Sequence, residues 1–400
     1  MNSKRLIVAA EVFSPNLGDY AIYDSLSKLL LSRDIEVIPL DISFRRGFSV
    51  DSTDPQPVSI TWRSLVPKKI KHHKFAQAII THAMWHLVHK KNIPTYWSEL
   101  ISSCDAVIIG GGQLLTDTSA NFHTKLALIT DIANEFNKPI CILGCGVESE
   151  FSYKAQKNIR KVLDSARFIS VRDSESANRL KPLIRNNISV NVYPDLAFAL
   201  DSNTNKSLED EGLEQKKTVC GFNIMPLDVF KRYNPTLKDI NTEAYVNFWK
   251  RLAREATKEK MQIHIMTNGS IEDQEQAKSI YESMLSDDVD TILIDRPISP
   301  QNLYDQISNV DCLITMRMHA GIIGQAYGKS VSTLIWDDKI PGVWEEAGDK
   351  RVAINSNIIL NADPWSEVRL AFEASRNIVL ADLNKKVFYS IDECLKVIYP

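Results

Sequence analysis

The sequence predicts an α/β protein with two doubly wound domains that face a cleft. Its 400 residues exceed one ordinary core and suffice for two domains of about 150–200 residues each. Apolar residues make up 44% of the chain and charged residues 24%, which is typical of a globular protein. Short apolar runs alternate with amphipathic stretches along most of the chain, and this pattern indicates parallel sheets covered by helices.

Residues 1–200 form the predicted first domain. Apolar runs are interpreted as its buried strands, and amphipathic stretches between them as helices. The strands are Lys4–Phe13, Ile35–Ile42, Ala106–Ile109, Ile140–Leu143, Phe168–Val171 and Val190–Tyr193. The helices are Tyr20–Leu31, Thr124–Phe136 and Tyr153–Leu163.

Residues 201–217 lose almost all apolar side chains and are interpreted as a linker, and a second domain follows in residues 218–363. Residues 364–400 are helical in pattern, and we expect this tail to cross back to the first domain. The strands of the second domain are Val219–Ile224, Met261–Met266, Thr291–Ile294, Cys312–Thr315 and Val331–Ile335. Its helices are Thr242–Lys260, Ile271–Leu285, Gln301–Ser308 and His319–Tyr327.

Composition excludes several classes of protein. The net charge of −3 argues against a general nucleic-acid binder, so no nucleic-acid partner is expected. No run of about 18 apolar residues is present to span a bilayer. The first residues lack the features of a signal peptide, and the six cysteines contain no CxxC pair. We therefore expect a cytoplasmic protein in a reducing compartment.

One segment, residues 63–98, contains no Asp or Glu and includes six lysines between Lys68 and Lys91. Its middle has the apolar spacing of an amphipathic helix. One interpretation is contact with an anionic membrane surface or a lipid pyrophosphate, which would place the protein at the inner face of the membrane. The alternative is an ordinary helix with solvated lysines outside.

The first candidate motif follows the first predicted strand and opens the first helix. Gly18 permits a tight turn, and Asn16 and Asp19 flank it. Free amide groups at a helix start favour an anion or sugar hydroxyls. The alternative is a plain turn in which Asp19 only caps the helix.

A run of three glycines follows the predicted strand Ala106–Ile109. Gly111 and Gly112 leave the backbone bare where ligands bind in such sheets. Asp117 lies close enough along the chain to meet a polar ligand. Close packing of the glycines and a helix cap at Asp117 are the alternatives.

Arg317 and His319 form the most specific pair, two residues apart at a strand–helix junction. The helix dipole disfavours a charged His319 and a bound phosphate favours it, so this imidazole could exchange a proton near neutrality. Arg172 ends another strand, and Lys339 follows the last one, so both are further candidate anion contacts. In the alternative, these side chains are ion-paired structural groups.

The ordered set resembles the polysaccharide pyruvyl transferase family over about residues 5–350. The matching residues are Asn16, Gly18, Asp19, Ala21, Ile22, the glycine run with Asp117, Arg172, Asp173, Ser176, Pro194, Asp195, Arg317, His319, Asp337 or Asp338, and Lys339. Gln113 and Tyr20 depart from the family pattern, which leaves the choice of acceptor open.

The resemblance implies a GT-B-like architecture of two Rossmann-type domains, with phosphoenolpyruvate as donor. It implies as acceptor a sugar of a cell-surface glycan, an exopolysaccharide or a lipid-linked precursor. Arg317 and His319 would hold the donor, with Arg172 as a second cationic contact.

Ketal formation needs a proton donor for the enol carbon, and His319 is the predicted acid. Asp117 or Asp19 would deprotonate the acceptor hydroxyl, and cations would neutralise the trianionic donor. This scheme requires no metal and no cofactor besides the donor substrate.

Two competing functions stay open. A GT-B glycosyltransferase that uses a nucleotide sugar would need a similar glycine loop and histidine. A non-catalytic subunit of a glycan-assembly complex would not need the pair Arg317 and His319 at all.

Overall fold

The computed structural model describes residues 4–48, 92–117, 121–185, 188–200, 217–234 and 237–400. The predicted basic helix between Lys68 and Lys91 and residues 201–216 of the predicted linker lie outside these ranges. The membrane contact that was assigned to the basic helix therefore stays a prediction.

The chain divides into two compact units. Unit 1 consists of residues 1–13, 26–193 and 388–400, and unit 2 of residues 14–25 and 194–387. The predicted domains are continuous ranges of the sequence, apart from the tail that was expected to cross back. Each observed unit instead combines one long range with one or more short segments from elsewhere in the sequence. The short segment after the first strand belongs to unit 2, and the end of the C-terminal helix belongs to unit 1.

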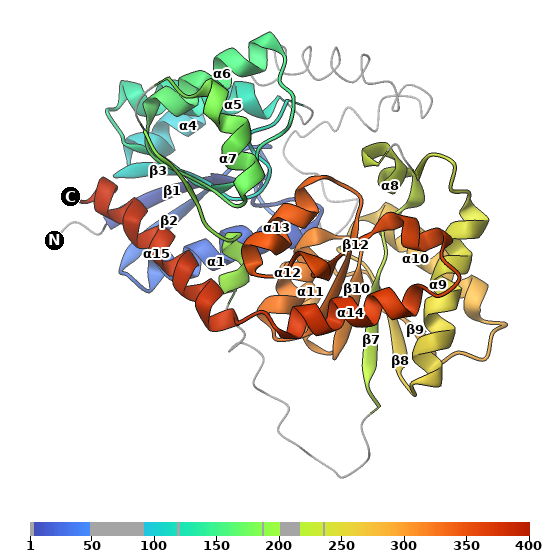
Figure 1. Cartoon of the computed structure of the whole chain (residues 1–400). Coiled ribbons are helices and arrows are strands. Elements are labelled where there is room, and N and C mark those ends of the chain that lie inside the picture. Colours follow the sequence, from blue (N-terminus) through green and yellow to red (C-terminus); the bar gives the residue numbers. More distant parts are fainter. Residues whose placement is uncertain (1–3, 49–91, 118–120, 186–187, 201–216, 235–236) are drawn as a thin grey trace. The chain divides into compact units, whose positions relative to one another are not determined.

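Unit 1 contains a six-stranded parallel sheet in the order β2-β1-β3-β4-β5-β6. Its strands are β1 (Lys4–Ala10), β2 (Ile35–Asp41), β3 (Ala106–Gly110), β4 (Ile140–Cys145), β5 (Ala166–Val171) and β6 (Val190–Val192). The associated helices are α1 (Tyr20–Leu31), α4 (Asn92–Ser102), α5 (Phe122–Glu135), α6 (Tyr153–Ser165), α7 (Ser174–Leu180) and α15 (Leu380–Ile398), of which α1 and α15 are shared with unit 2. Figure 1 shows the helices lying over the strands.

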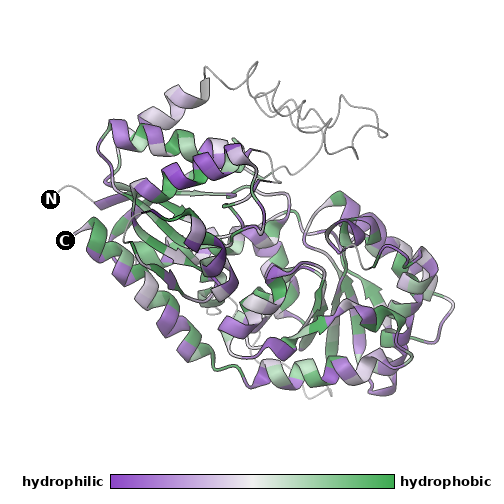
Figure 2. Ribbon diagram, turned by 45° about the horizontal axis from the view of Figure 1, so that its top comes forward, coloured by the Kyte–Doolittle hydropathy of each residue, from purple (hydrophilic) through white to green (hydrophobic). Residues whose placement is uncertain are grey.

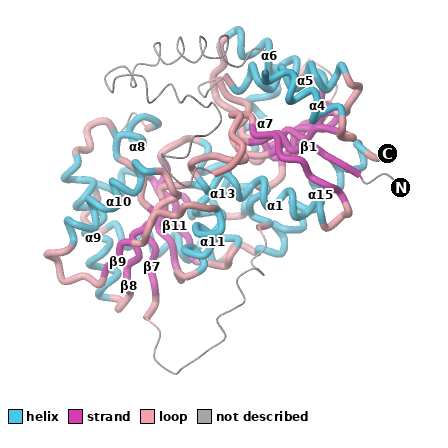
Figure 3. The backbone as a smooth tube through the Cα atoms, turned by 180° about the vertical axis from the view of Figure 1, so that it is seen from behind, coloured by secondary structure: helices cyan, strands magenta, loops and turns pink. Residues whose placement is uncertain are grey.

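Unit 2 contains a second six-stranded parallel sheet in the order β12-β11-β10-β7-β8-β9. Its strands are β7 (Val219–Asn223), β8 (Gln262–Met266), β9 (Thr291–Leu293), β10 (Cys312–Thr315), β11 (Ser330–Ile335) and β12 (Ala353–Asn355). Its helices are α8 (Leu227–Tyr233), α9 (Thr242–Lys258), α10 (Ile271–Met284), α11 (Pro300–Ser308), α12 (Met318–Ala326), α13 (Lys339–Ala347) and α14 (Pro364–Arg376). Figure 3 shows helices and strands alternating in both units.

The inner strands form from continuous apolar runs that are buried on both faces of each sheet, as parallel sheets require, whereas the edge strands β6 and β9 are only partly buried. In β3, β4 and β7 every residue is buried. In Figure 2 the strands are mostly hydrophobic, and the helices that cover them carry hydrophilic residues on one side. The helices start at side chains that accept a backbone N–H bond, such as Ser270 before α10 and Ser299 before α11. The predicted doubly wound architecture is therefore confirmed for each unit.

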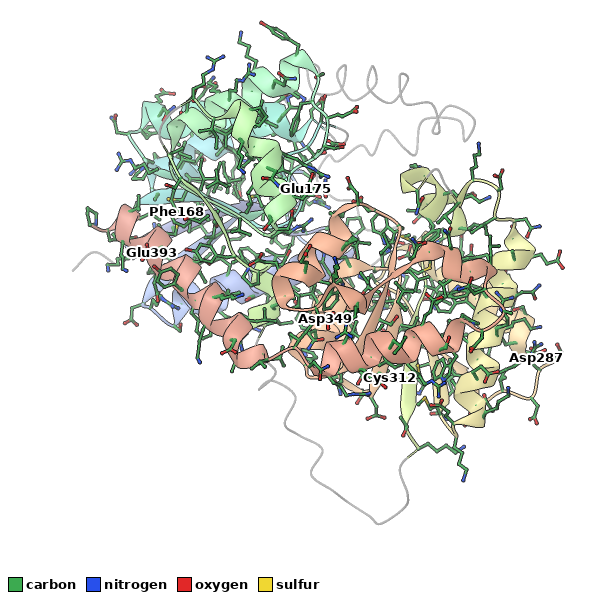
Figure 4. All side chains as sticks on the ribbon, in the orientation of Figure 1. Phe168, Glu175, Asp287, Cys312, Asp349 and Glu393 are labelled. Carbon is green, nitrogen blue, oxygen red and sulfur yellow. The ribbon has the colours of Figure 1, made fainter. Side chains whose placement is uncertain are left out.

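All six cysteines are free and buried. Cys312, labelled in Figure 4, lies on β10 opposite Cys220 of β7. Burial raises the pKa of the Cys220 thiol, as does the neighbouring Cys312. None of the helices in the described part of the chain combines the length and apolar character that crossing a bilayer requires.

Candidate active site

His319 lies in unit 2 between two carboxylates. It occupies the first turn of α12, directly after β10, and only 7% of it is exposed. Its Nδ1 lies 2.8 Å from Oδ1 of Asp19, which ends the short 3-10 helix η1 (Leu17–Asp19). Its Nε2 lies 3.9 Å from Oδ2 of the fully buried Asp195. The distance from Nε2 exceeds that of a hydrogen bond, and Nε2 is buried without a hydrogen-bond partner among the described residues.

The two carboxylates hold His319 in its charged form. Burial lowers the pKa of His319, but the hydrogen bond to Asp19 and the nearby charges of Asp19 and Asp195 outweigh burial and raise it to about 9. Burial raises the pKa of Asp19, and His319, Ser14 and Arg317 together bring it below its ordinary value. The sequence predicts proton exchange by His319 near neutrality, from the helix dipole and a bound phosphate; the carboxylates of Asp19 and Asp195, which are distant in sequence, raise the pKa above that range. At neutral pH the imidazolium form prevails.

Arg317 is held by a carboxylate that the sequence analysis did not select. Its Nε and Nη2 donate to the two oxygens of Asp273, at 3.0 and 2.5 Å. Asp273 is 1% exposed and lies in the first turn of α10, where its backbone N–H donates to Ser270. The pair uses two of the three guanidinium nitrogens, and the side chain of Arg317 is 16% exposed.

The segment Asn16–Asp19 meets this part of unit 2 closely. The backbone N–H of Leu17 donates to the carbonyl of Asn268, at 3.0 Å. A Cβ on Gly18 would lie 2.7 Å from Nδ2 of Asn268 and 3.0 Å from Cβ of His319, so only glycine fits there. Asp19 does not act as a plain helix cap, because its carboxylate accepts from Ser14, Asn16 and His319.

Five predicted site residues are thus brought together in unit 2: Asn16, Gly18, Asp19, Arg317 and His319. The elements that position them are η1, the end of β10 and the start of α12. Asp195 joins them as the N-cap of the 3-10 helix η4 (Leu196–Ala199), where its Oδ1 accepts from the N–H of Ala197. The cap role and the contact with His319 use different oxygens of Asp195.

The glycine run and Asp117 belong to unit 1. Gly111 and Gly112 have φ values of 69° and 67°, a left-handed backbone that favours glycine whether or not a ligand binds. Asp117 Oδ1 lies 3.3 Å from Nε2 of His123, and its Oδ2 accepts from the N–H of Ser152. Burial lowers the pKa of His123 despite the opposing charge of Asp117.

Arg172 lies deep in unit 1. It is 1% exposed and its guanidinium packs on Gly146, where a Cβ would lie 2.7 Å from Nη2. Its Nε lies 3.7 Å from Oδ2 of Asp173, which also caps α7 through Ser176. Ser176 in turn accepts from the N–H of Val147, so this motif connects β5 and α7 to the loop after β4.

Lys339, the first residue of α13 in unit 2, is paired within its own turn. Its Nζ lies 3.0 Å from Oδ2 of Asp337 and 5.1 Å from the ring centroid of Trp336. Burial raises the pKa of Asp337, and the charge and bonds of Lys339 bring it below its ordinary value. Each predicted cation, Arg172, Arg317 or Lys339, therefore has a carboxylate near it.

The sequence matches the model of the polysaccharide pyruvyl transferase family over residues 16–338. The chain belongs to this family. The resemblance seen in the sequence is thereby confirmed, and membership places the chain among transferases. No curated protein is similar enough to be matched.

The fold of this chain is similar to those of several solved structures, although the sequence identities are low. A Listeria monocytogenes protein provisionally named UDP-N-acetylglucosamine 2-epimerase has a TM-score of 0.57 at 12% identity, over 98% of this chain and 96% of its own. The UDP-GlcNAc 2-epimerase of Neisseria meningitidis, solved with UDP-GlcNAc, gives 0.54 at 12% identity, over 98% and 100%. That of Methanocaldococcus jannaschii gives 0.54 at 10% identity, over 98% and 99%. These similarities show a shared two-domain α/β fold of the GT-B type.

Proposed function

We propose that this family member transfers the pyruvyl group of phosphoenolpyruvate to a saccharide and forms a pyruvate ketal. The acceptor is a sugar of a cell-surface glycan or exopolysaccharide, or its lipid-linked precursor. One observation carries the proposal: His319 is kept as an imidazolium by Asp19 and Asp195, two residues from Arg317. Family membership supports the same reaction class.

The reaction needs one proton donor and two acceptor hydroxyls. Nε2–H of His319 gives its proton to the enol CH₂ of the donor, which becomes CH₃ and leaves an oxocarbenium-like centre at C2. A sugar hydroxyl forms a C–O bond to C2 and loses its proton. The C2–O bond to phosphate then breaks, and a second hydroxyl adds to C2 and loses its proton. One released proton restores His319 and the other leaves with inorganic phosphate.

The donor is an anion, so its contacts are expected among cations and backbone amides. Arg317 offers the third guanidinium nitrogen beside the two that hold Asp273. Arg172, Lys339, Asn16, Gly18, Gly111 and Gly112 stay predicted substrate contacts. For Arg172 and Lys339 this role requires exchange of a carboxylate partner for the donor.

Two carboxylates were predicted as the acceptor base, and their surroundings differ. Asp19 accepts a bond from the imidazolium and has a lowered pKa, which makes it a weak base. Asp117 is 23% exposed at its side chain and lies beside a histidine with a lowered pKa. Both carboxylates stay predicted bases, Asp19 in unit 2 and Asp117 in unit 1.

The test is phosphate release from phosphoenolpyruvate with a panel of saccharide acceptors. Release is expected only when a suitable acceptor is present. His319→Ala should lower kcat by about 10²–10⁴-fold. Arg317→Ala should mainly raise KM for the donor, by about 10–100-fold, because a charge-assisted bond is lost.

Matched controls exist in the same unit. His264→Ala removes a partly buried histidine of β8, and Arg351→Ala breaks an exposed ion pair with Asp349. Both should keep wild-type kinetics. Full activity of His319→Ala would sink the proposed mechanism and favour a non-catalytic subunit.

A glycosyltransferase that uses a nucleotide sugar is the second candidate, since the fold neighbour from Neisseria meningitidis was solved with UDP-GlcNAc. Thermal unfolding separates the two functions. Phosphoenolpyruvate should raise Tm and UDP-sugars should leave it unchanged. The reverse result would decide for the glycosyltransferase.

A further inference from the structure

Three asparagine side chains of unit 2 form one continuous hydrogen-bond chain that ends on Asp19. Thr315 Oγ1 lies 3.0 Å from Asn223 Oδ1 and 2.9 Å from the carbonyl oxygen of Arg317, so its one hydroxyl proton is shared between two acceptors. Asn223 Nδ2 donates to Asn268 Oδ1 at 2.9 Å. Asn268 Nδ2 donates to Asn16 Oδ1 at 3.1 Å, and Asn16 Nδ2 donates to Asp19 Oδ1 at 3.1 Å. In every asparagine the oxygen accepts and the nitrogen donates, so the chain has one direction, with N–H groups facing Asp19.

The sheet places the first members of this chain. Thr315 ends β10 and Asn223 ends β7, and these two residues are register partners on neighbouring strands. Asn268 follows β8, the next strand of the sheet, by two residues. All three are fully buried.

Complete burial makes the direction of the chain rigid. A buried amide loses free energy unless both its oxygen and its nitrogen are bonded. If Asn268 were turned over, its nitrogen would face the nitrogen of Asn223 and its oxygen would face the oxygen of Asn16. Each amide therefore fixes the next, and the carboxylate of Asp19, which can only accept, sets the direction by requiring N–H from Asn16.

The last amide of the hydrogen-bond chain, that of Asn16, comes from a distant part of the sequence. Asn16 and Asn268 are 252 residues apart, and the Leu17 backbone bond to Asn268 fastens the same contact. The absent side chain of Gly18 leaves the room that the Asn268 amide occupies. The motif Asn-x-Gly-Asp thus supplies the last amide of the hydrogen-bond chain, the space beside Gly18 that the Asn268 amide fills, and the carboxylate that accepts the last bond.

Asp19 is the point where this chain meets the proposed acid. Its Oδ1 accepts from both Asn16 and His319, and its Oδ2 accepts from Ser14. A carboxylate with three donors is held ionised and in one rotamer. Because Nδ1–H of His319 donates to Asp19, the other ring nitrogen, Nε2, faces Asp195 at 3.9 Å.

We infer that Asn223, Asn268 and Asn16 are positioning residues for the reaction, because their amide chain fixes Asp19 against His319 Nδ1. The inference rests on the proposed role of His319 as proton donor. Without the chain, Asp19, whose side chain is 29% exposed, keeps Ser14 and His319 as partners but loses the amide that fixes its rotamer. Asp195 then opposes burial with less help from Asp19, and the charged form of His319 is lost at a lower pH.

The test is Asn268→Ala, which removes the middle amide without adding a charge. The titration of His319 in the folded protein is followed by NMR of labelled histidine, assigned with His319→Gln. Its midpoint should move down by at least about one pH unit from the wild-type value. With substrate, kcat should fall about 10–100-fold, its alkaline limb should move the same way, and KM for phosphoenolpyruvate should stay within about twofold.

Two further variants make the result decisive. Asn302→Ala, at an exposed position of α11, should titrate and turn over like the wild type. Asn223→Ala breaks the chain one step earlier and replaces Asn268→Ala if that protein does not fold. A folded variant with a lower Tm but an unchanged His319 titration and pH profile would show a purely structural chain and overturn the inference. The titration needs no substrate, so it decides this point even if phosphoenolpyruvate proves not to be the donor.

Discussion

His319 shows how one side chain can keep a proton that its burial disfavours. Burial alone lowers the pKa of an imidazole, and carboxylates on both sides reverse the shift. Asp19 binds Nδ1 directly, whereas Asp195 acts on Nε2 from 3.9 Å. The imidazole therefore stays protonated at neutral pH, as the proposed acid requires, and its Nε2 has no hydrogen-bond partner among the described residues.

This predicts how the rate depends on pH. Because the charged imidazole gives the proton, kcat should be constant around neutrality and fall as pH rises through about 9. The measurement is phosphate release at saturating donor between pH 6 and 10. In Asp19→Asn the fall should begin at lower pH, because the stronger of the two stabilising contacts is gone. An alkaline limb in the same place for both proteins would contradict the assignment.

The same shift predicts a pH-dependent stability. A group whose pKa is raised on folding contributes stability that is complete below the unfolded value of about 6.5 and lost as pH rises through the folded value of about 9. The difference in free energy of unfolding between wild type and His319→Gln should therefore shrink across that window. Urea unfolding at several pH values measures it. A difference that grew with pH would have the wrong sign.

At the scale of elements, η1 is a short turn whose packing depends on a missing side chain. Gly18→Ala would place a methyl group 2.7 Å from Asn268 Nδ2 and 3.0 Å from His319 Cβ. We expect a loss of about 1–3 kcal/mol of stability and a lower kcat, since both neighbours must move. Chemical unfolding and phosphate release measure the two effects. Gly47→Ala is the control, because a Cβ there meets no atom within 4 Å and both quantities should stay unchanged.

The elements differ in how far the sequence predicts them. Runs such as Ala106–Ile109 were identified because both faces of a parallel strand are buried, so the run is continuously apolar. The strand β12 was missed, because it has three residues and only its middle one is buried. The helix α8, with seven residues, was missed as well.

The residues of the candidate site likewise divide into those that the sequence predicts and those that it does not. Arg317 and His319 were predicted because they are neighbours at one strand–helix junction. Asp273, Asn223 and Asn268 were missed, because their importance comes from partners that lie far away in the sequence, such as Arg317, 44 residues after Asp273. The spacing Ser270-x-x-Asp273 signals a helix start but cannot identify that partner.

At the scale of the whole molecule, the end of the chain completes unit 1. Within residues 388–400, Ile391 and Cys394 are buried, Asp392 pairs with Arg33 at 2.8 Å, and Tyr399 donates to Asp105. The last part of α15, red in Figure 1, is therefore part of the core of this unit.

Removal of this segment should destabilise unit 1. A chain that ends at Val387 loses buried apolar side chains, each worth about 2–5 kcal/mol when deleted from a core. Calorimetry and limited proteolysis should show early unfolding and cleavage within residues 92–193. Lys396→Ala, which alters only an exposed pair with Glu393, should leave both measurements unchanged. Unchanged unfolding of the shortened chain would contradict the assignment of the segment to the core.

The membership of residues 14–25 in unit 2 has a consequence for recombination between genes. Asp19 and its partner His319 are 300 residues apart in the sequence. A single crossover between residues 25 and 194 would give the second sheet a carboxylate from one parent and an imidazole from the other. Chimeras that exchange unit 2 as a whole therefore need a second, short donor fragment that encodes residues 14–25.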